Sequence, residues 1–194
     1  MKSSNSIINN LSITQKYIIL LLHANNDRSL QGKLWLQKIL FLISQNIEEL
    51  NEDADFEEDL LGPYSEIVAE EFDQLISEKI IKKKFPHDLS IYGKTIANNL
   101  EREISIEEKQ IIEHMKDFLN DLTDDELLGF IYFSYPEFTQ ESIKYDKIKK
   151  NRIDIAISLY EKNKISLGKA ALISDLNQEE LIRRLKVKGV KVYA

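Results

Sequence analysis

Cysteine is absent from the 194 residues, and its absence removes several kinds of chemistry together. Disulfides, thiolate metal sites and thiol nucleophiles all require it, and a chain without cysteine is typical of a reducing compartment. We therefore expect a cytoplasmic protein. Glycine is also scarce: the six glycines form neither a GxGxxG nor a P-loop pattern, so no loop that wraps nucleotide phosphates is predicted.

Metal-binding patterns are equally sparse. The three histidines, His23, His87 and His114, stand apart from one another and have no ligand spacing. Six carboxylates crowd residues 52–59, but they lack the glycine and the ligand order of an EF-hand, so a solvated acidic loop is expected. We predict no metal, no cofactor and no catalytic residues, and hence no enzyme. An active site assembled only by tertiary folding stays open as an alternative.

Long hydrophobic runs are absent as well. The longest apolar stretch near the start, residues 18–22, is far shorter than the ~20 residues needed to span a membrane. The opening MKSSNSIINN lacks the basic, apolar and small-residue order of a secretory signal. We expect the protein to stay in water, without a membrane partner.

Charge is plentiful but unevenly distributed. The net charge is -7, yet residues 1–142 carry 13 basic and 27 acidic residues, whereas residues 143–194 carry 13 and 6. We predict two domains on this division, an acidic body (1–142) and a basic unit (143–194), with the polar stretch 139–151 as the linker. Because salt screens charges beyond about 10 Å, the basic unit can attract phosphate despite the acidic body. Chance clustering of solvated charges is the alternative.

The N-terminal half has the element order of a winged helix. Ser12 is placed to cap a first helix, and a strongly apolar second helix over 32–45 is expected to be buried. Ser65 begins a third helix, and residues 80–85 and 89–93 are typical of two short strands around a turn. We therefore predict a mainly α fold that opens with a winged-helix-like domain and its short β-hairpin.

The charges of this predicted winged helix argue against DNA as its ligand. The third helix carries five carboxylates between residues 66 and 78, which repel phosphate. Only the predicted wing, Lys82 to Lys84, is basic. We therefore expect the acidic half to bind a protein partner.

The remaining chain is predicted to be helical. Capping-box spacings at 105–108 and 123–126 indicate two helices, which form a helical middle. Near the end, Ser166 and Asn177 are placed to cap two short helices, the second ending near residue 188. Two short helices around a tight turn have the dimensions of a helix-turn-helix.

The second of these helices is the predicted DNA reader. Its first turn carries Gln178, from where a side chain can reach base edges, and the basic residues around it are expected to contact phosphate. The predicted DNA-binding residues are Lys169, Gln178, Arg183, Arg184, Lys186, Lys188 and Lys191. In the alternative interpretation, the apolar residues of these helices pack a small three-helix unit whose basic residues merely stay solvated.

Residues 33–100 resemble a known prokaryotic domain. KLWLQKILFL at 33–42, GPYS at 62–65 and LISEKII at 75–81 are similar to the Panacea domain of many antitoxins and phage-linked regulators. This resemblance implies a protein that neutralises or adapts a partner protein without catalysis.

Residues 152–192 resemble a second family. IAISLY at 155–160, ISLGKAA at 165–171 and the segment 181–189 are similar to a small prokaryotic family of presumed antitoxins, often encoded beside PIN-domain ribonuclease toxins. The chain departs from that family in lacking its preceding strand segment and in being fused to a helical body. The resemblance implies toxin neutralisation or transcriptional control.

Together these observations predict an antitoxin-like protein or transcription regulator. Its acidic body is expected to bind a toxin or another protein partner, and its basic helix-turn-helix to bind DNA, with its own promoter as one candidate target. A homodimer is also expected, because DNA readers of this size usually contact two half-sites. The alternative function is a protein–protein interaction module or proteolytic adaptor without DNA binding.

Overall fold

The computed structural model describes residues 8–192, and these residues fold as helices joined by turns without a β-strand. The first seven residues, where the prediction of no secretory signal begins, lie outside the described part, as do residues 193–194. The contacts divide the chain into two compact units: Met1–Glu57 with Pro63–Asp121, and Glu58–Gly62 with Leu122–Ala194. The mainly α fold is confirmed.

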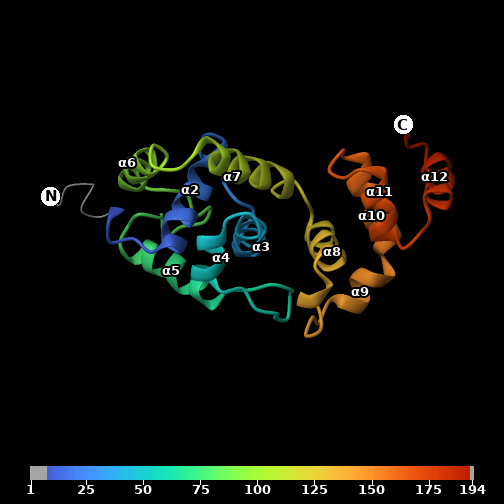
Figure 1. Ribbon diagram of the computed structural model, residues 1–194, viewed down its shortest axis with the longest axis horizontal. Helices are drawn as coiled ribbons and strands as arrows, with labels where there is room; N and C mark the ends of the chain where they lie inside the picture. Colours follow the sequence, from blue (N-terminus) through green and yellow to red (C-terminus); the bar gives the residue numbers. More distant parts are fainter. Residues whose placement is uncertain (1–7, 193–194) are drawn as a thin grey trace. The chain divides into compact units, whose positions relative to one another are not determined.

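The first unit contains six named helices (Figure 1). They are α2 (Ile13–Asp27), α3 (Lys33–Ser44), α4 (Glu48–Ala54), α5 (Glu66–Ser77), α6 (Ile91–Leu100) and α7 (Ile106–Leu119). Ser12 caps α2 as predicted, since its Oγ accepts a hydrogen bond from the Gln15 backbone N–H. Ten of the twelve residues of α3 are buried, which confirms it as the core helix of this unit.

The predicted β-hairpin is wrong. Within residues 80–93 only one antiparallel bridge forms, between Ile81 and Leu89. The segment expected as the second strand turns into α6 instead, because the Ser90 side chain caps that helix by accepting from the Gly93 N–H at 3.0 Å. The apolar and aromatic residues Leu89, Ile91 and Tyr92 around Ser90 concealed this N-cap. Without a hairpin, the winged-helix prediction has no support.

Two sequence motifs of the first unit meet in its core. The Gln37 side chain accepts from the Ser65 N–H at 3.0 Å and donates to the Ser65 carbonyl at 2.9 Å. Next to it, the buried Lys38 ammonium donates to the Pro63 carbonyl at 2.7 Å. Because both partners are backbone atoms, these contacts attach residues 63–65 to α3 and set where α5 begins.

The second unit contains the remaining elements (Figure 1). They are α8 (Asp124–Ser134), the 3-10 turn η1 (Pro136–Phe138), α9 (Tyr145–Lys150), α10 (Arg152–Glu161), α11 (Leu167–Ser174) and α12 (Gln178–Val187). The stretch 139–151, expected to be a linker, contains α9, which buries Ile148 completely. It is therefore part of a folded unit.

The boundary between units lies before the change in charge. The second unit begins at Leu122, whereas the predicted division lies between residues 142 and 143. The physical reason is packing: α8 lies against α10 and α11, and a Cβ added to Gly129 would come within 2.7 Å of Ile155. As a result the second unit carries 13 basic and 13 acidic residues, and the first carries 13 and 20.

A short segment from the middle of the first unit completes the second. The Leu60 carbonyl accepts from the Ile143 N–H at 3.1 Å, and Gly62, at φ 81°, faces the ring of Tyr132. A Cβ at position 62 would lie only 2.9 Å from the Tyr132 ring. The left-handed backbone there would also be unfavourable for any residue with a side chain. Among residues 8–192, no helix is both long enough and apolar enough to cross a bilayer.

Candidate nucleic-acid interface

The predicted helix-turn-helix segment folds as two short helices around a tight turn. The Asn177 side chain accepts from the Glu180 N–H at 2.9 Å and so caps α12 as expected. The turn closes through Asp175, whose backbone is left-handed, and through the hydrogen bond from Leu176 N–H to the Ala171 carbonyl. These local contacts explain why both helices could be located from the sequence.

One face of α12 is buried and the other carries the cations. Leu181 and Leu185 are completely buried against the rest of the unit. The segment from Gln178 to residue 191 carries five basic and two acidic residues, and all five basic side chains are exposed. The positive charge is therefore a local property of one helix face in a unit that is neutral overall.

Arg183 and Arg184 lie on the exposed face and share one carboxylate. Their side chains are 70% and 47% exposed, and both form ion pairs with Glu180, at 2.8 and 3.1 Å. Glu180 lies on the same helix, at the i−3 and i−4 positions. The arginines are thus held along the helix surface by a charge that partly neutralises them.

Lys186, Lys188 and Lys191 continue the exposed cations towards the chain end. The Lys188 ammonium lies 2.6 Å from Asp154, on α10 of the same unit. Among the described residues, Lys186 and Lys191 have no carboxylate within ion-pair distance. Gln178 is also exposed, and its amide nitrogen lies beside Gly168 of α11.

Lys169 has a different environment from the other predicted residues. Its ammonium lies 5.5 Å from the centre of the Phe130 ring of α8, and the side chain is half-buried. Burial lowers the pKa of Lys169. This side chain is directed at an aromatic ring, which the sequence pattern did not reveal, because Phe130 is far away along the chain.

Arg152 is a residue of this region that the sequence analysis missed. Its guanidinium donates to the carbonyls of Ile173 at 2.7 Å and Leu172 at 3.3 Å, and pairs with Asp175 at 3.1 Å. It also lies 4.4 Å from the centre of the Phe133 ring. Arg152 therefore caps the end of α11 and stabilises the turn between α11 and α12. No local pattern identifies such a role, since its partners lie 19 to 23 residues away along the chain.

A buried carboxylate on α8 also fixes the position of α10 in this region. Glu126, on α8, is 7% exposed and binds the Lys162 ammonium at 2.7 Å and the Ser158 hydroxyl at 2.5 Å, both associated with α10. Burial alone would raise its pKa, but the hydrogen bonds from Lys162, Ser158 and Thr123 hold the pKa of Glu126 below its ordinary value. The charged pair fixes α10, on which α11 packs.

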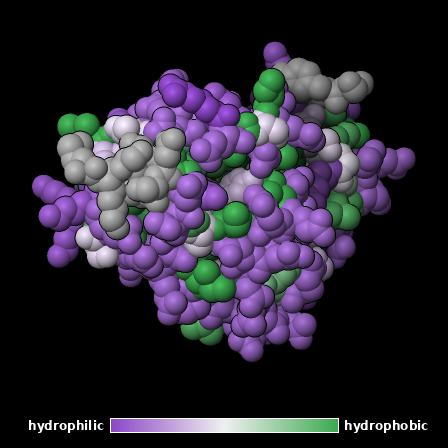
Figure 2. Space-filling model, turned by 60° about the vertical axis from the view of Figure 1, so that its left-hand side comes forward, coloured by the Kyte–Doolittle hydropathy of each residue, from purple (hydrophilic) through white to green (hydrophobic). Residues whose placement is uncertain are grey.

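The exposed surface of α11 and α12 is largely polar. Figure 2, in which the side of α5 and α6 comes forward, shows a face where hydrophilic side chains predominate and hydrophobic ones form small, separate groups. The exposed apolar side chains include Leu172 of α11, at 58%, and Val187 of α12, at 88%. The exposed cations of α12 therefore have a few exposed apolar side chains as neighbours.

Comparison with known proteins finds a similarity to a protein family in this part of the chain. A model described as an uncharacterised protein family (UPF0175) matches residues 131–194. The match lies wholly within the second unit and includes the segment 152–192 that showed the second resemblance. The resemblance of residues 33–100 to the Panacea domain receives no support. No curated protein and no solved structure matches the chain.

Proposed function

We propose that this chain is an antitoxin-like protein or transcription regulator that binds DNA through α12. The observation that carries the proposal is the row of exposed cations on that helix, of which Arg183 and Arg184 pair with Glu180 and Lys188 pairs with Asp154, both in the same unit. The UPF0175 match over 131–194 is compatible with an antitoxin, as the second resemblance implies.

The remaining parts of the proposal follow from the first unit and from the size of the reader. The acidic first unit, with 20 acidic and 13 basic residues, binds a toxin or another protein partner. A homodimer presents two copies of α12 to two half-sites. The protein acts in the cytoplasm by binding, not by catalysis.

DNA binding is tested by titrating the full chain with fluorescent duplexes, including its own promoter, from about 50 to 300 mM salt. Affinity is expected to fall steeply with salt, because phosphate contacts release counterions. The double variant Arg183→Gln/Lys186→Gln should raise Kd at least tenfold and reduce the salt slope by about 2. The matched control Lys79→Gln/Arg102→Gln removes two exposed cations of the first unit and should leave duplex binding unchanged.

If the affinity for duplex does not depend on salt, or if no duplex binds, the proposal that α12 binds DNA is wrong. The second candidate is then an interaction module or proteolytic adaptor, in which Arg183 and Arg184 contact a partner protein. It is favoured by the exposed Leu172 and Val187 near the same cations. Co-purification from the native cell separates the two, since the adaptor loses its partner when the arginines are replaced.

A further inference from the structure

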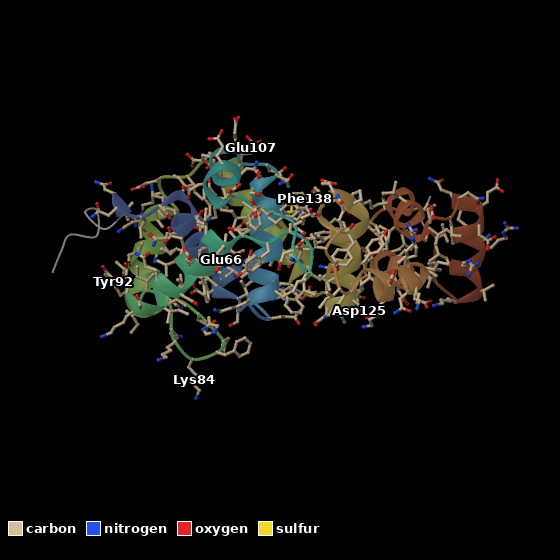
Figure 3. The ribbon with its side chains drawn as sticks, turned by 90° about the horizontal axis from the view of Figure 1, so that it is seen from below. Glu66, Lys84, Tyr92, Glu107, Asp125 and Phe138 are labelled. Carbon is tan, nitrogen blue, oxygen red and sulfur yellow. The ribbon has the colours of Figure 1, made fainter. Side chains whose placement is uncertain are left out.

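The turn between α5 and α6 carries three consecutive lysines and an exposed aromatic ring. We call residues 82–88, of sequence KKKFPHD, the lysine loop. Figure 3 shows Lys84 at the outer end of this loop, pointing away from the helices of the first unit. Phe85, the next residue, is 59% exposed.

The lysine loop has a defined conformation. The bridge between Ile81 and Leu89 closes its base, and the Lys82 N–H donates to the Asp88 carbonyl at 2.8 Å. The His87 ring lies 3.2 Å from the Lys82 carbonyl through Nδ1. A loop ordered by its own hydrogen bonds presents its side chains without a large entropic cost on binding.

The loop groups three cations on the surface of this acidic unit, whose exposed cations Lys79 and Arg102, unpaired among the described residues, lie outside the loop. Six other basic side chains of the unit are buried or bound to carboxylates: Arg28, Lys33, Lys38, Lys94, Lys109 and Lys116. In the loop, Lys82 is 3.7 Å from Asp88, a loose pair. Within the described residues, neither Lys83 nor Lys84 has a carboxylate at ion-pair distance. A local positive charge therefore projects from a negative unit.

The Phe85 ring packs against neighbouring rings of the first unit. The rings of Phe85 and His87 meet edge to face at 6.0 Å, and His87 meets Phe72 in the same manner at 5.5 Å. The Lys33 ammonium lies 5.2 Å from the centre of the Phe72 ring. The hollow between these groups is only ≈ 10 Å³, room for about one water, so a flat ligand must stack on the outside of Phe85.

We propose that the lysine loop binds single-stranded nucleic acid, with its lysines on the phosphates and Phe85 stacked on a base. An exposed ring beside cations is the arrangement that such proteins use, and it needs an unstacked base, which a duplex does not offer. A strand is narrow enough to follow one loop, where the carboxylates of Asp88 and Asp73 already pair with Lys82 and Lys33. An anionic membrane presents a broad surface that those carboxylates would repel. The inference does not depend on α12.

The test measures binding of the full chain to a labelled 20-nucleotide single strand, to a 20-base-pair duplex and to an abasic strand of the same length. Lys83→Gln/Lys84→Gln should raise Kd for the single strand about tenfold. Phe85→Leu, which keeps the loop apolar, should raise it about five- to tenfold, but should not affect the abasic strand, which has no base to stack. Lys79→Gln/Arg102→Gln is the matched control and should bind as the native chain does.

Several outcomes would overturn the inference. An equal loss on the abasic strand after Phe85→Leu would show that the ring does not stack on bases. An equal loss on duplex and single strand after the lysine change would show a general phosphate contact. Binding to phosphatidylserine vesicles is measured with the same variants. If Lys83→Gln/Lys84→Gln loses vesicle binding but keeps oligonucleotide binding, the loop is a membrane contact. The lysine variant is also compared with the native chain in thermal unfolding, and since both side chains are exposed, no change is expected. Loss of duplex binding through α12 alone leaves the single-strand result unaffected, so the two proposals fail separately.

Discussion

At the scale of single residues, the two arginines of α12 form ion pairs with the same carboxylate. Glu180 binds both Arg183 and Arg184, whereas Glu179, one position earlier, has no ion pair among the described contacts. On an exposed helix such pairs contribute little to stability, about 0.3–0.5 kcal/mol each. Their larger effect is on the charge that α12 presents to a ligand.

Replacing Glu180 with Gln should therefore strengthen DNA binding. The change frees both arginines and removes a negative charge from the face that approaches phosphate, so Kd for a duplex should fall about three- to tenfold at low salt. Fluorescence anisotropy measures it. Glu179→Gln removes the same charge without releasing a pair, and an equal gain in that control would contradict the role given to Glu180.

At the scale of elements, the ends of helices decide where the chain turns, and one end is held from a distance. The Lys116 ammonium, completely buried on α7, donates to the carbonyls of Leu21, Leu22 and Ala24 at 2.8, 3.3 and 2.8 Å. The backbone of α2 departs from helical geometry from Ala24 to Asn26, which leaves these carbonyls needing donors. Lys116 supplies them and joins α2 to α7.

This buried amine predicts how stability depends on pH. Burial lowers the pKa of Lys116 from 10.5 to about 8, so between these values the folded protein binds fewer protons than the unfolded chain. The free energy of unfolding should thus gain up to about 3 kcal/mol from this group as pH rises from about 8 to 10.5. Denaturant unfolding across this range should show the gain in the native chain and lose it in Lys116→Met. The control Lys109→Met, on the exposed side of α7, should retain it; a gain in both variants would assign the effect to another group.

At the scale of the whole molecule, contacts and charges divide the chain at different places. The charge changes sign near residue 142, but α8, before that point, packs on α10 and α11. Residues 58–62 also join the second unit, so the chain contributes to it twice. The unit is neutral as a body and basic on one helix face.

Two fragments test this division. Residues 122–194 retain α8 with its buried Glu126, whereas residues 143–194 lose both. The longer fragment should show helical circular dichroism and a cooperative thermal transition, and the shorter one should be mostly unfolded, because removing α8 exposes the apolar faces of α10 and α11. An equally cooperative transition in the shorter fragment would place the boundary at the change in charge. The longer fragment should melt below the second unit of the full chain, since it lacks the Leu60 and Gly62 contacts.

The sequence alone determined the parts of this protein that depend on neighbouring residues. Ser12, Ser105, Thr123, Ser166 and Asn177 cap helices because a side-chain oxygen and a backbone N–H three positions later meet whatever the rest of the chain does. The predicted hairpin was wrong for the same reason, because the Ser90 side chain caps α6 locally and this cap outweighed a weaker strand pattern. Tertiary structure alone decided which cations are available, because that depends on partners far along the chain: Arg152 with the end of α11, Lys169 with Phe130, and Lys116 with α2. Lysine and arginine have the same charge wherever they occur in a sequence, and only folding determines which of them stay exposed to solvent.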